Sequence, residues 1–189
     1  MANIFVPDYM FLSYRDITPE FLKSIDISAL LIDIDNTLAP YEQDEPDEHI
    51  FSWFSSLKEN GIKATLVSNN ERKRVELFNR ELGLPAFFKS GKPFSKNLKK
   101  AMAIMGSNSS NTAMLGDQLL TDAAAGKNIG LRTIIVPPIR DKSNLFFRTK
   151  RALELPAIKK YVSLTADCEN AKIVCSFWLE GKYKLKNSN

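Results

Sequence analysis

Short runs of apolar residues recur along the chain, between longer segments whose apolar positions have a helical spacing. The first run, residues 29–32 (Ala-Leu-Leu-Ile), is bounded by polar residues and leads into Asp33. A short run that is apolar throughout is typical of a strand buried on both faces of a parallel sheet. Short and mostly apolar runs predict further strands over residues 62–67, 87–88, 112–115 and 133–136.

The segments between these runs have the pattern of helices. Residues 48–60 place their large apolar side chains on one helical face, and Gly61 follows as a stop signal. Thr18 before Pro19 is the usual order of a cap and a first-turn residue at a helix start. Further helices are predicted over residues 71–82, 95–105 and 121–128.

Strands that alternate with helices indicate an α/β fold, Rossmann-like and doubly wound, around a mainly parallel sheet. Such sheets bind ligands in the crevice beyond the carboxyl ends of their strands. Polar clusters follow or lie near the ends of the predicted strands: Asp33-Ile34-Asp35, Ser68-Asn69, Lys92 and Asp117. The sequence therefore predicts that these scattered side chains converge on one site.

The C-terminal part of the chain gives weaker patterns. A last helix is expected around residues 145–161, and Pro156 should end or kink it. Residues 173–186 are compatible with one or two strands. We expect residues 1–155 to form one domain, and residues 156–189 to be a C-terminal extension that packs on that domain or trails from it.

Asp33 and Asp35 stand two positions apart at the end of the first predicted strand. One carboxylate can attack phosphorus as a nucleophile, and the other can protonate the leaving oxygen and then activate water. The pattern is also common without catalysis, because Asp35-Asn36-Thr37 is ordinary turn chemistry. The pair alone leaves both interpretations open.

A second acidic cluster runs from Gly116-Asp117 to Asp122, after the strand predicted at residues 112–115. Its carboxylates can complete a magnesium site with Asp33, because Mg²⁺ prefers hard oxygen ligands. The metal would offset the repulsion between an anionic nucleophile and an anionic phosphate. Asp122 can equally be a helix-start residue.

Three further polar residues suit a phosphate group. Ser68 has a hydroxyl, and together with Asn69 it can offer backbone N–H donors to phosphoryl oxygens. Lys92 can place a point charge on the phosphate and the nucleophile. Each of these residues can also be explained without a ligand, as a turn residue or a solvated lysine. Only their order along the chain supports a phosphate site.

That order, Asp-x-Asp-x-Thr, Ser-Asn, Lys-Pro and Gly-Asp-x-x-x-x-Asp, resembles the haloacid dehalogenase (HAD) superfamily of phosphotransferases. Within it, the chain is similar to the YqeG-like branch of subfamily IIIA over roughly residues 7–155. One departure is Ser90-Gly91 before Lys92, where that branch more usually has an alanine-containing sequence. The segments that carry the resemblance are residues 33–38, 67–70, 91–93, 116–122 and 130–138.

The resemblance implies a role for each matching residue. Asp33 would be the phosphorylated nucleophile and a Mg²⁺ ligand, and Asp35 the general acid–base, with its backbone carbonyl on the metal. Asp117 would bind Mg²⁺ through its carboxylate. Asp122 would not bind the ion directly, but would support the direct ligands or contact the ion through a water molecule. The residues expected to hold the phosphoryl group are Ser68, Asn69 and Lys92.

Residues 38–64 and 70–90 each hold one predicted helix, which is too little for an independent cap domain. An open, capless site suits a phosphate on something large, such as a lipid headgroup. The YqeG-like branch is similar to phosphatidylglycerophosphate phosphatases of mitochondria and plastids, which implies conversion of that lipid to phosphatidylglycerol. Two alternatives stay open: a phosphatase for a soluble nucleotide or sugar phosphate, and a non-catalytic binding or regulatory protein on the same fold.

Composition changes this picture little. The 189 residues carry a net charge of +4, which suits anionic partners but selects none, and no nucleic-acid-reading motif is present. Basic and aromatic residues at 145–151 and 159–161 would favour an anionic bilayer surface, but an ordinary surface helix with solvated charges is the interpretation we favour. We expect a cytoplasmic location, free or peripheral at the inner face of the membrane. The sequence does not set an oligomeric state.

Overall fold

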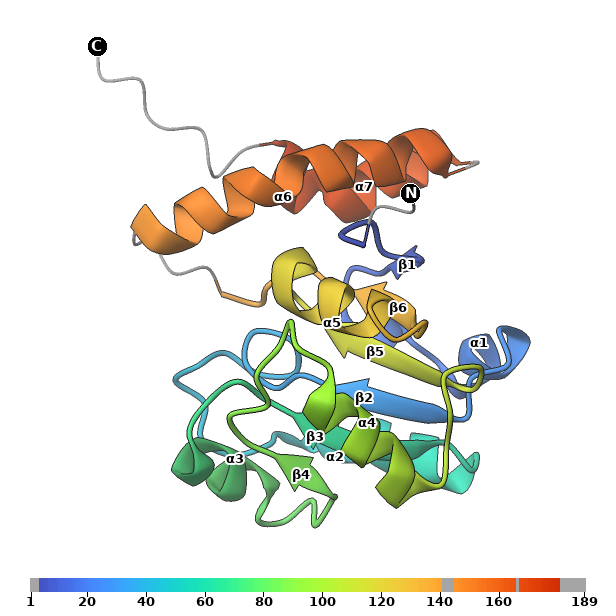
Figure 1. The fold of residues 1–189 in the computed structure, drawn as a ribbon, viewed down its shortest axis with the longest axis vertical. Coiled ribbons are helices and arrows are strands. Elements are labelled where there is room, and N and C mark those ends of the chain that lie inside the picture. Colours follow the sequence, from blue (N-terminus) through green and yellow to red (C-terminus); the bar gives the residue numbers. More distant parts are fainter. Residues whose placement is uncertain (1–3, 141–144, 166, 181–189) are drawn as a thin grey trace.

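Six parallel strands form one sheet in the computed structural model, in the order β1-β6-β5-β2-β3-β4 (Figure 1). The structure describes residues 4–140, 145–165 and 167–180, with the backbone alone for residues 145–148 and 168. The strands are β1 (Tyr9–Met10), β2 (Ala29–Ile32), β3 (Lys63–Val67), β4 (Ala86–Phe87), β5 (Thr112–Gly116) and β6 (Arg132–Ile135). The predicted Rossmann-like, doubly wound α/β fold is confirmed.

Helices connect the strands at nearly the predicted positions. Thr18 caps the first of them by accepting a hydrogen bond of 3.2 Å from the backbone N–H of Phe21. Asp47 caps the second in the same way, through the N–H of Ile50 at 2.9 Å. The helices are α1 (Pro19–Ser24), α2 (Glu48–Glu59), α3 (Arg72–Asn79), α4 (Lys96–Met105), α5 (Ala124–Lys127), α6 (Leu145–Leu164) and α7 (Cys168–Leu179), with short turns η1 (Tyr14–Asp16) and η2 (Leu119–Ala123).

The central strand β2 is fully buried because helices cover both faces of the sheet. Leu30 and Ile32 point to the face where α1, α2 and α3 pack. Ala29 and Leu31 point to the opposite face, against α4 and α5. This alternation explains why the strand is apolar throughout, since successive side chains of a strand face opposite sides.

No cap domain is inserted between the strands. Residues 38–64 and 70–90, all of which the structure describes, hold α2 and α3 respectively as their only helices. The prediction of a capless fold is therefore confirmed. In the described part of the chain, no helix has both the length and the apolar character that crossing a bilayer requires.

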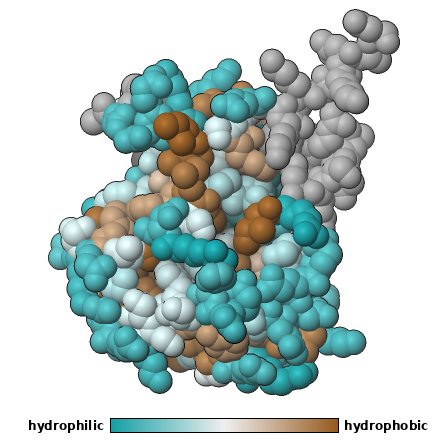
Figure 2. All heavy atoms as spheres, turned by 180° about the vertical axis from the view of Figure 1, so that it is seen from behind, coloured by the Kyte–Doolittle hydropathy of each residue, from teal (hydrophilic) through white to brown (hydrophobic). Residues whose placement is uncertain are grey.

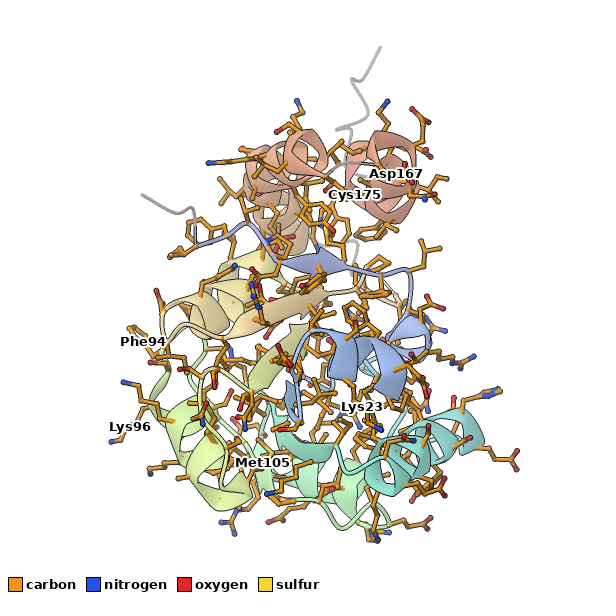
Figure 3. All side chains as sticks on the ribbon, turned by 90° about the vertical axis from the view of Figure 1, so that its right-hand side faces the viewer. Lys23, Phe94, Lys96, Met105, Asp167 and Cys175 are labelled. Atoms are coloured by element: carbon orange, nitrogen blue, oxygen red, sulfur yellow. The ribbon has the colours of Figure 1, made fainter. Side chains whose placement is uncertain are left out.

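Helices α6 and α7 form a hairpin beyond the β1 edge of the sheet (Figure 1). Its inner side forms a third apolar cluster with β1, β6 and η2. Figure 3 shows Cys175 in α7, and its buried thiol belongs to this cluster. Trp178 and Ile158 are also fully enclosed there, at 1% and 0% exposure. The hairpin is thus packed firmly on the α/β core.

The strands predicted within residues 173–186 are wrong as far as the structure describes that segment, because residues 173–179 belong to α7. Ala171, Cys175 and Trp178 are buried at a spacing of four and three residues, which is the period of a helix. β-Branched residues such as Ile173 and Val174 are common in strands, but in this segment helical packing against α6 decides the outcome. Residues 181–186 lie outside the described residues.

Two smaller differences concern Pro156 and β1. Helix α6 continues through Pro156 to Leu164, so the proline does not end it. Strand β1, which the sequence did not predict, consists of two residues that pair with Ile134 and Ile135 of β6. A strand this short has no periodicity to detect. The division at residues 155 and 156 remains a prediction, although α6 runs across it.

Candidate active site

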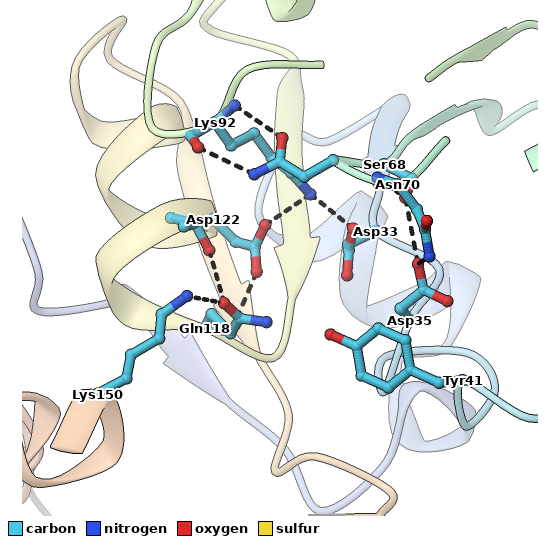
Figure 4. A pocket seen from close by; sticks show the side chains of 11 residues that line it. Asp33, Asp35, Tyr41, Ser68, Asn70, Lys92, Gln118, Asp122 and Lys150 are labelled. Carbon is cyan, nitrogen blue, oxygen red and sulfur yellow. Dashed lines mark hydrogen bonds and ion pairs between the residues drawn. The ribbon is translucent and has the colours of Figure 1, made fainter. Parts of the chain in front are cut away.

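The predicted polar residues lie at the carboxyl ends of three adjacent strands. Asp33 follows β2, Ser68 follows β3 and Asp117 follows β5. Asp33 and Ser68 line a pocket of about 390 Å³, shown in Figure 4, whereas Asp117 is fully buried and is not part of its lining. Its lining residues are Asp33, Asp35, Tyr41, Ser68, Asn69, Asn70, Lys92, Gln118, Thr121, Asp122 and Lys150. The fold thus brings together side chains that are up to 117 positions apart in sequence, since Asp33 after β2 and Lys150 in α6 line one pocket.

Lys92 joins two carboxylates at the floor of the site. Its Nζ lies 2.6 Å from Asp33 Oδ1 and 2.7 Å from Asp122 Oδ1, and its side chain is only 2% exposed. Burial by itself lowers the pKa of a lysine, but here the Asp122 and Asp33 carboxylates outweigh it and raise the pKa of Lys92. The lysine is therefore a permanent buried cation beside Asp33.

Asn69 holds the loop that carries Lys92. Its Nδ2 donates to the carbonyl oxygen of Lys92 at 2.9 Å, and its Oδ1 accepts from the N–H of Lys92 at 2.9 Å. The hydroxyl of Ser90 donates to the same Oδ1 at 2.8 Å. These contacts give Asn69 a role in fixing the lysine, beside any contact its backbone makes with a ligand.

The carboxylate of Asp35 accepts hydrogen bonds from three side chains. Ser68 Oγ and Asn70 Nδ2 donate to its Oδ2 at 3.3 and 3.2 Å. Arg74 Nε donates to its Oδ1 at 3.1 Å, and both side chains of this ion pair are about nine-tenths buried. Ser68, which the sequence assigned to the phosphoryl group, is thus bonded to Asp35 in this structure.

Asp33 is enclosed and crowded by other acids. Burial raises its pKa well above the usual range, Lys92 opposes this shift, and the carboxylates of Asp122, Asp117 and Asp35 add to it. The Thr37 hydroxyl donates weakly to Asp33 Oδ2 at 3.4 Å. A negative charge at Asp33 is therefore costly unless further positive charge enters the site.

Asp117 is fully buried and bound to Arg151 of α6. Arg151 donates to Asp117 Oδ2 at 2.6 Å and to the Asp117 carbonyl oxygen at 2.9 Å. The other carboxylate oxygen, Oδ1, is buried and has no hydrogen-bond partner among the residues that the structure describes. Burial raises the pKa of Asp117 to about 6, and the Arg151 guanidinium opposes this rise. An unpartnered, buried carboxylate oxygen suits a cation ligand.

Arg151 behaves differently from either expectation for the basic residues at 145–151. It was grouped with basic residues that either meet a bilayer or stay solvated, whereas its side chain is 1% exposed and paired with Asp117 and Glu154. Residues 145–148 of the same segment have side chains outside the described residues. The basic pattern alone could not distinguish a solvated arginine from a buried one.

Asp33, Asp117 and Asp122 form an acidic group that fits a divalent metal. Each offers one oxygen, and these oxygens all lie within 4.8 Å of one another. Gly116 allows this arrangement, because a Cβ at Gly116 would lie 2.3 Å from Asp122 Cγ. The Gln118 N–H further fixes Asp122 by donating to its Oδ2 at 3.0 Å. Hard oxygen ligands of this kind suit Mg²⁺.

The rim of the pocket carries residues that the sequence did not single out. Tyr41 lines one part, and burial together with the nearby acids raises its pKa. Gln118 and Lys150 line the part near α6, where Lys150 Nζ donates to Gln118 Oε1. Arg74 could have been suspected, since it lies in the first turn of the helix that follows β3, near the same sheet edge.

Comparison with known proteins assigns the family. A model of the haloacid dehalogenase-like hydrolases matches residues 16–130. The chain therefore belongs to the haloacid dehalogenase-like hydrolase family, which confirms the resemblance seen in the sequence and makes the protein a hydrolase.

Among individual relatives, the chain is 36% identical to probable phosphatase YqeG of Bacillus subtilis over 163 residues, which is 85% of this chain and 95% of that protein. It is 31% identical to pyrophosphatase PpaX of Halalkalibacterium halodurans over 101 residues, which is 49% of this chain and 46% of that protein. A solved structure from Listeria monocytogenes serotype 4b matches with a TM-score of 0.50 and 13% identity, over 62% of this chain and 85% of that one. At this identity the last likeness concerns the fold alone.

Proposed function

We propose that the protein is a magnesium-dependent phosphomonoester phosphatase that forms an aspartyl-phosphate on Asp33. The observation that carries the proposal is the position of Asp33 at the end of β2, with Lys92 2.6 Å away and two further acids within metal-binding distance. The likeness to a probable phosphatase over most of both chains supports the same reaction. Two lysines, Lys92 and Lys150, line the pocket and favour an anionic substrate.

In the first half of the reaction, a carboxylate oxygen of Asp33 attacks the phosphorus atom, and the bond from phosphorus to the alcohol oxygen breaks. Asp35 gives a proton to that leaving oxygen, so the alcohol departs neutral. In the second half, Asp35 takes a proton from water, whose oxygen attacks the phosphorus. The bond to Asp33 then breaks, and inorganic phosphate and the free carboxylate are formed.

Lys92 and the loops around it hold the phosphoryl group in this scheme. The ammonium of Lys92 offsets negative charge on both the nucleophile and the phosphoryl oxygens, and Ser68 supplies a donor at the end of β3. Asn69 keeps the backbone of Lys92 in place through its two 2.9 Å hydrogen bonds. Arg74 and Asn70 orient Asp35 through its two carboxylate oxygens.

Asp33 and Asp117 would be the carboxylate ligands of Mg²⁺, with the backbone carbonyl of Asp35, and Asp122 would lie behind them or contribute through water. The unpartnered Oδ1 of Asp117 and the mutual repulsion of the acids support this assignment. When bound, the ion supplies positive charge that stabilises the anionic nucleophile and the phosphoryl oxygens.

For the substrate, we propose phosphatidylglycerophosphate, which the enzyme would convert to phosphatidylglycerol at an anionic membrane surface. The capless pocket gives a large substrate direct access. Helix α6 exposes Leu153 and Leu164, at 63% and 69%, together with Lys159 and Lys160. On the face shown in Figure 2, hydrophobic residues are scattered among hydrophilic ones.

The decisive experiment measures phosphate release from phosphatidylglycerophosphate in detergent micelles, with Mg²⁺ or with a chelator, for the wild type and Asp33→Asn. We expect release that requires Mg²⁺ and is lost in the variant. A panel of nucleotide and sugar phosphates is run in parallel. If a soluble ester is hydrolysed much faster than the lipid, the substrate belongs to that soluble class. If the folded wild type hydrolyses none of the esters, the proposed phosphatase activity is wrong.

A further inference from the structure

We propose that the α6–α7 hairpin is part of the metal centre, with Arg151 as a positioning residue that holds Asp117 ready for Mg²⁺. The inference rests on the proposed metal site. It gives a specific role to the C-terminal hairpin, which lies outside the segment of 16–130 that matches the family.

The contact between Arg151 and Asp117 is directional. The guanidinium binds Oδ2 at 2.6 Å and the backbone carbonyl of the same residue at 2.9 Å. Two contacts to one residue fix both the side chain and the strand end that carries it. Since Oδ2 is occupied, Oδ1 is the oxygen left for a metal, and it has no hydrogen-bond partner.

Glu154 holds Arg151 in turn. Its Oε2 lies 3.0 Å from Arg151 NH1 and accepts from the indole N–H of Trp178 at 3.2 Å. Its Oε1 accepts from the N–H of Leu119 at 2.9 Å, which ties α6 to η2. Arg151, Glu154 and Trp178 are all 1% exposed or less. The network therefore links α7, α6 and the turn after β5 without access to water.

The charges in this network indicate that Arg151 orients the carboxylate of Asp117 and does not attract the metal ion. A lone arginine beside a metal site would repel Mg²⁺, but Glu154 balances the charge of Arg151. A buried ion pair is seldom kept for stability, because apolar residues of similar volume are often as stable. Side chains that orient metal ligands typically change metal affinity by about 10- to 100-fold when they are removed. Ligand orientation thus explains why two charges are buried here.

The test uses a charge-balanced double variant, Arg151→Met with Glu154→Gln, in the full-length chain. Mg²⁺ affinity is measured by calorimetry on protein whose folding is verified by circular dichroism and thermal unfolding. We expect affinity at least about tenfold weaker than in the wild type. The matched control is Trp178→Phe, which removes the bond to Glu154 and some packing but leaves the contact between Arg151 and Asp117 in place. Its affinity should stay within about threefold.

Arg151→Lys provides a second route if the double variant does not fold. Lysine keeps the charge but cannot bridge the two Asp117 oxygens as a planar guanidinium does. We expect the Mg²⁺ concentration for half-maximal activity to rise about tenfold, while kcat at saturating Mg²⁺ stays near the wild-type value. Unchanged Mg²⁺ affinity in either folded variant would overturn the inference alone. A wild type that hydrolyses phosphate esters without binding Mg²⁺ would instead overturn the metal site, and this inference with it.

Discussion

Arg74 Nε lies 3.1 Å from Asp35 Oδ1, in a nearly buried ion pair between α3 and the loop after β2. The same guanidinium also donates to the carbonyl oxygens of Asp44 and Pro40, at 3.3 and 3.5 Å. Arg74 therefore connects the proposed general acid–base to the loop that carries Tyr41, which lines the pocket.

Replacement of Arg74 by methionine should lower kcat about tenfold or more, because Asp35 loses a donor that orients it for proton transfer. Mg²⁺ affinity should be nearly unchanged, since Arg74 does not touch the acidic group around Asp33. Steady-state kinetics at saturating Mg²⁺ measure the effect. Arg72→Met is the matched control, because Arg72 is 66% exposed and its contacts, an ion pair with Glu76 at 3.6 Å and the Phe88 ring at 4.6 Å, do not involve Asp35. Equal activity of the two variants would show that Arg74 has no positioning role.

Asp33→Asn should stabilise the metal-free protein by about 1–2 kcal/mol near pH 8, although it abolishes activity. The pKa of Asp33 is raised in the folded state, so its contribution to stability is present below the unfolded-state pKa and is lost as pH rises through the folded-state value. The neutral asparagine avoids that loss. The advantage of the variant should therefore shrink as the pH falls through the folded-state pKa of Asp33.

Denaturant unfolding in the presence of a chelator, at several pH values, tests this expectation. Added Mg²⁺ should reverse the order, since it binds the folded wild type and stabilises it by mass action. A wild type that is more stable than the variant at pH 8 without metal would contradict the proposed strain among the acids.

Gly116→Ala should destabilise the protein by about 1–3 kcal/mol and weaken metal binding together, because the new Cβ would lie 2.3 Å from Asp122 Cγ. Thermal unfolding and Mg²⁺ calorimetry measure the two effects. Gly61→Ala is a useful control, since a Cβ added there would meet no neighbouring atom of the described residues within 4 Å and only its φ of +76° is unfavourable. This control should lose some stability but keep Mg²⁺ affinity, and a shared loss of affinity would refute the steric argument.

Cys175 should be almost unreactive in the native protein. Burial raises the pKa of its thiol from 9.0 to about 11, so the thiolate fraction at pH 8 is about 100-fold lower than for an unperturbed thiol. Alkylation by iodoacetamide in a Cys168→Ser background, with and without urea, measures the difference. A native rate within a few fold of the urea rate would show that the thiol is accessible.

The sheet and most of its helices could be predicted from the sequence because their signals are local. β2 is an apolar run between polar residues, and the burial of all four residues follows from covering both faces. The convergence of Asp33, Ser68 and Lys92 could also be predicted, since parallel strands end at one edge. The catalytic and metal-binding roles of these residues are still predictions.

The network around Arg151 could not be predicted, because it depends on how α6 docks rather than on any local pattern. Arginine in a basic helix is ordinarily solvated, and only tertiary packing shows that Arg151 reaches Asp117 across 34 positions. The same reason explains the wrong strands within residues 173–186. Ile173 and Val174 favour a strand by composition, while the contact of α7 with α6 makes that segment helical.

The hairpin also has a consequence for synthesis on the ribosome. The strands β2, β3 and β5 are all synthesised before Arg151 and the Glu154–Trp178 pair, which support Asp117 in the folded protein. Until α7 emerges, the growing chain holds several mutually repelling acids at one sheet edge. The proposed metal site is therefore complete only after α6 and α7 have been synthesised.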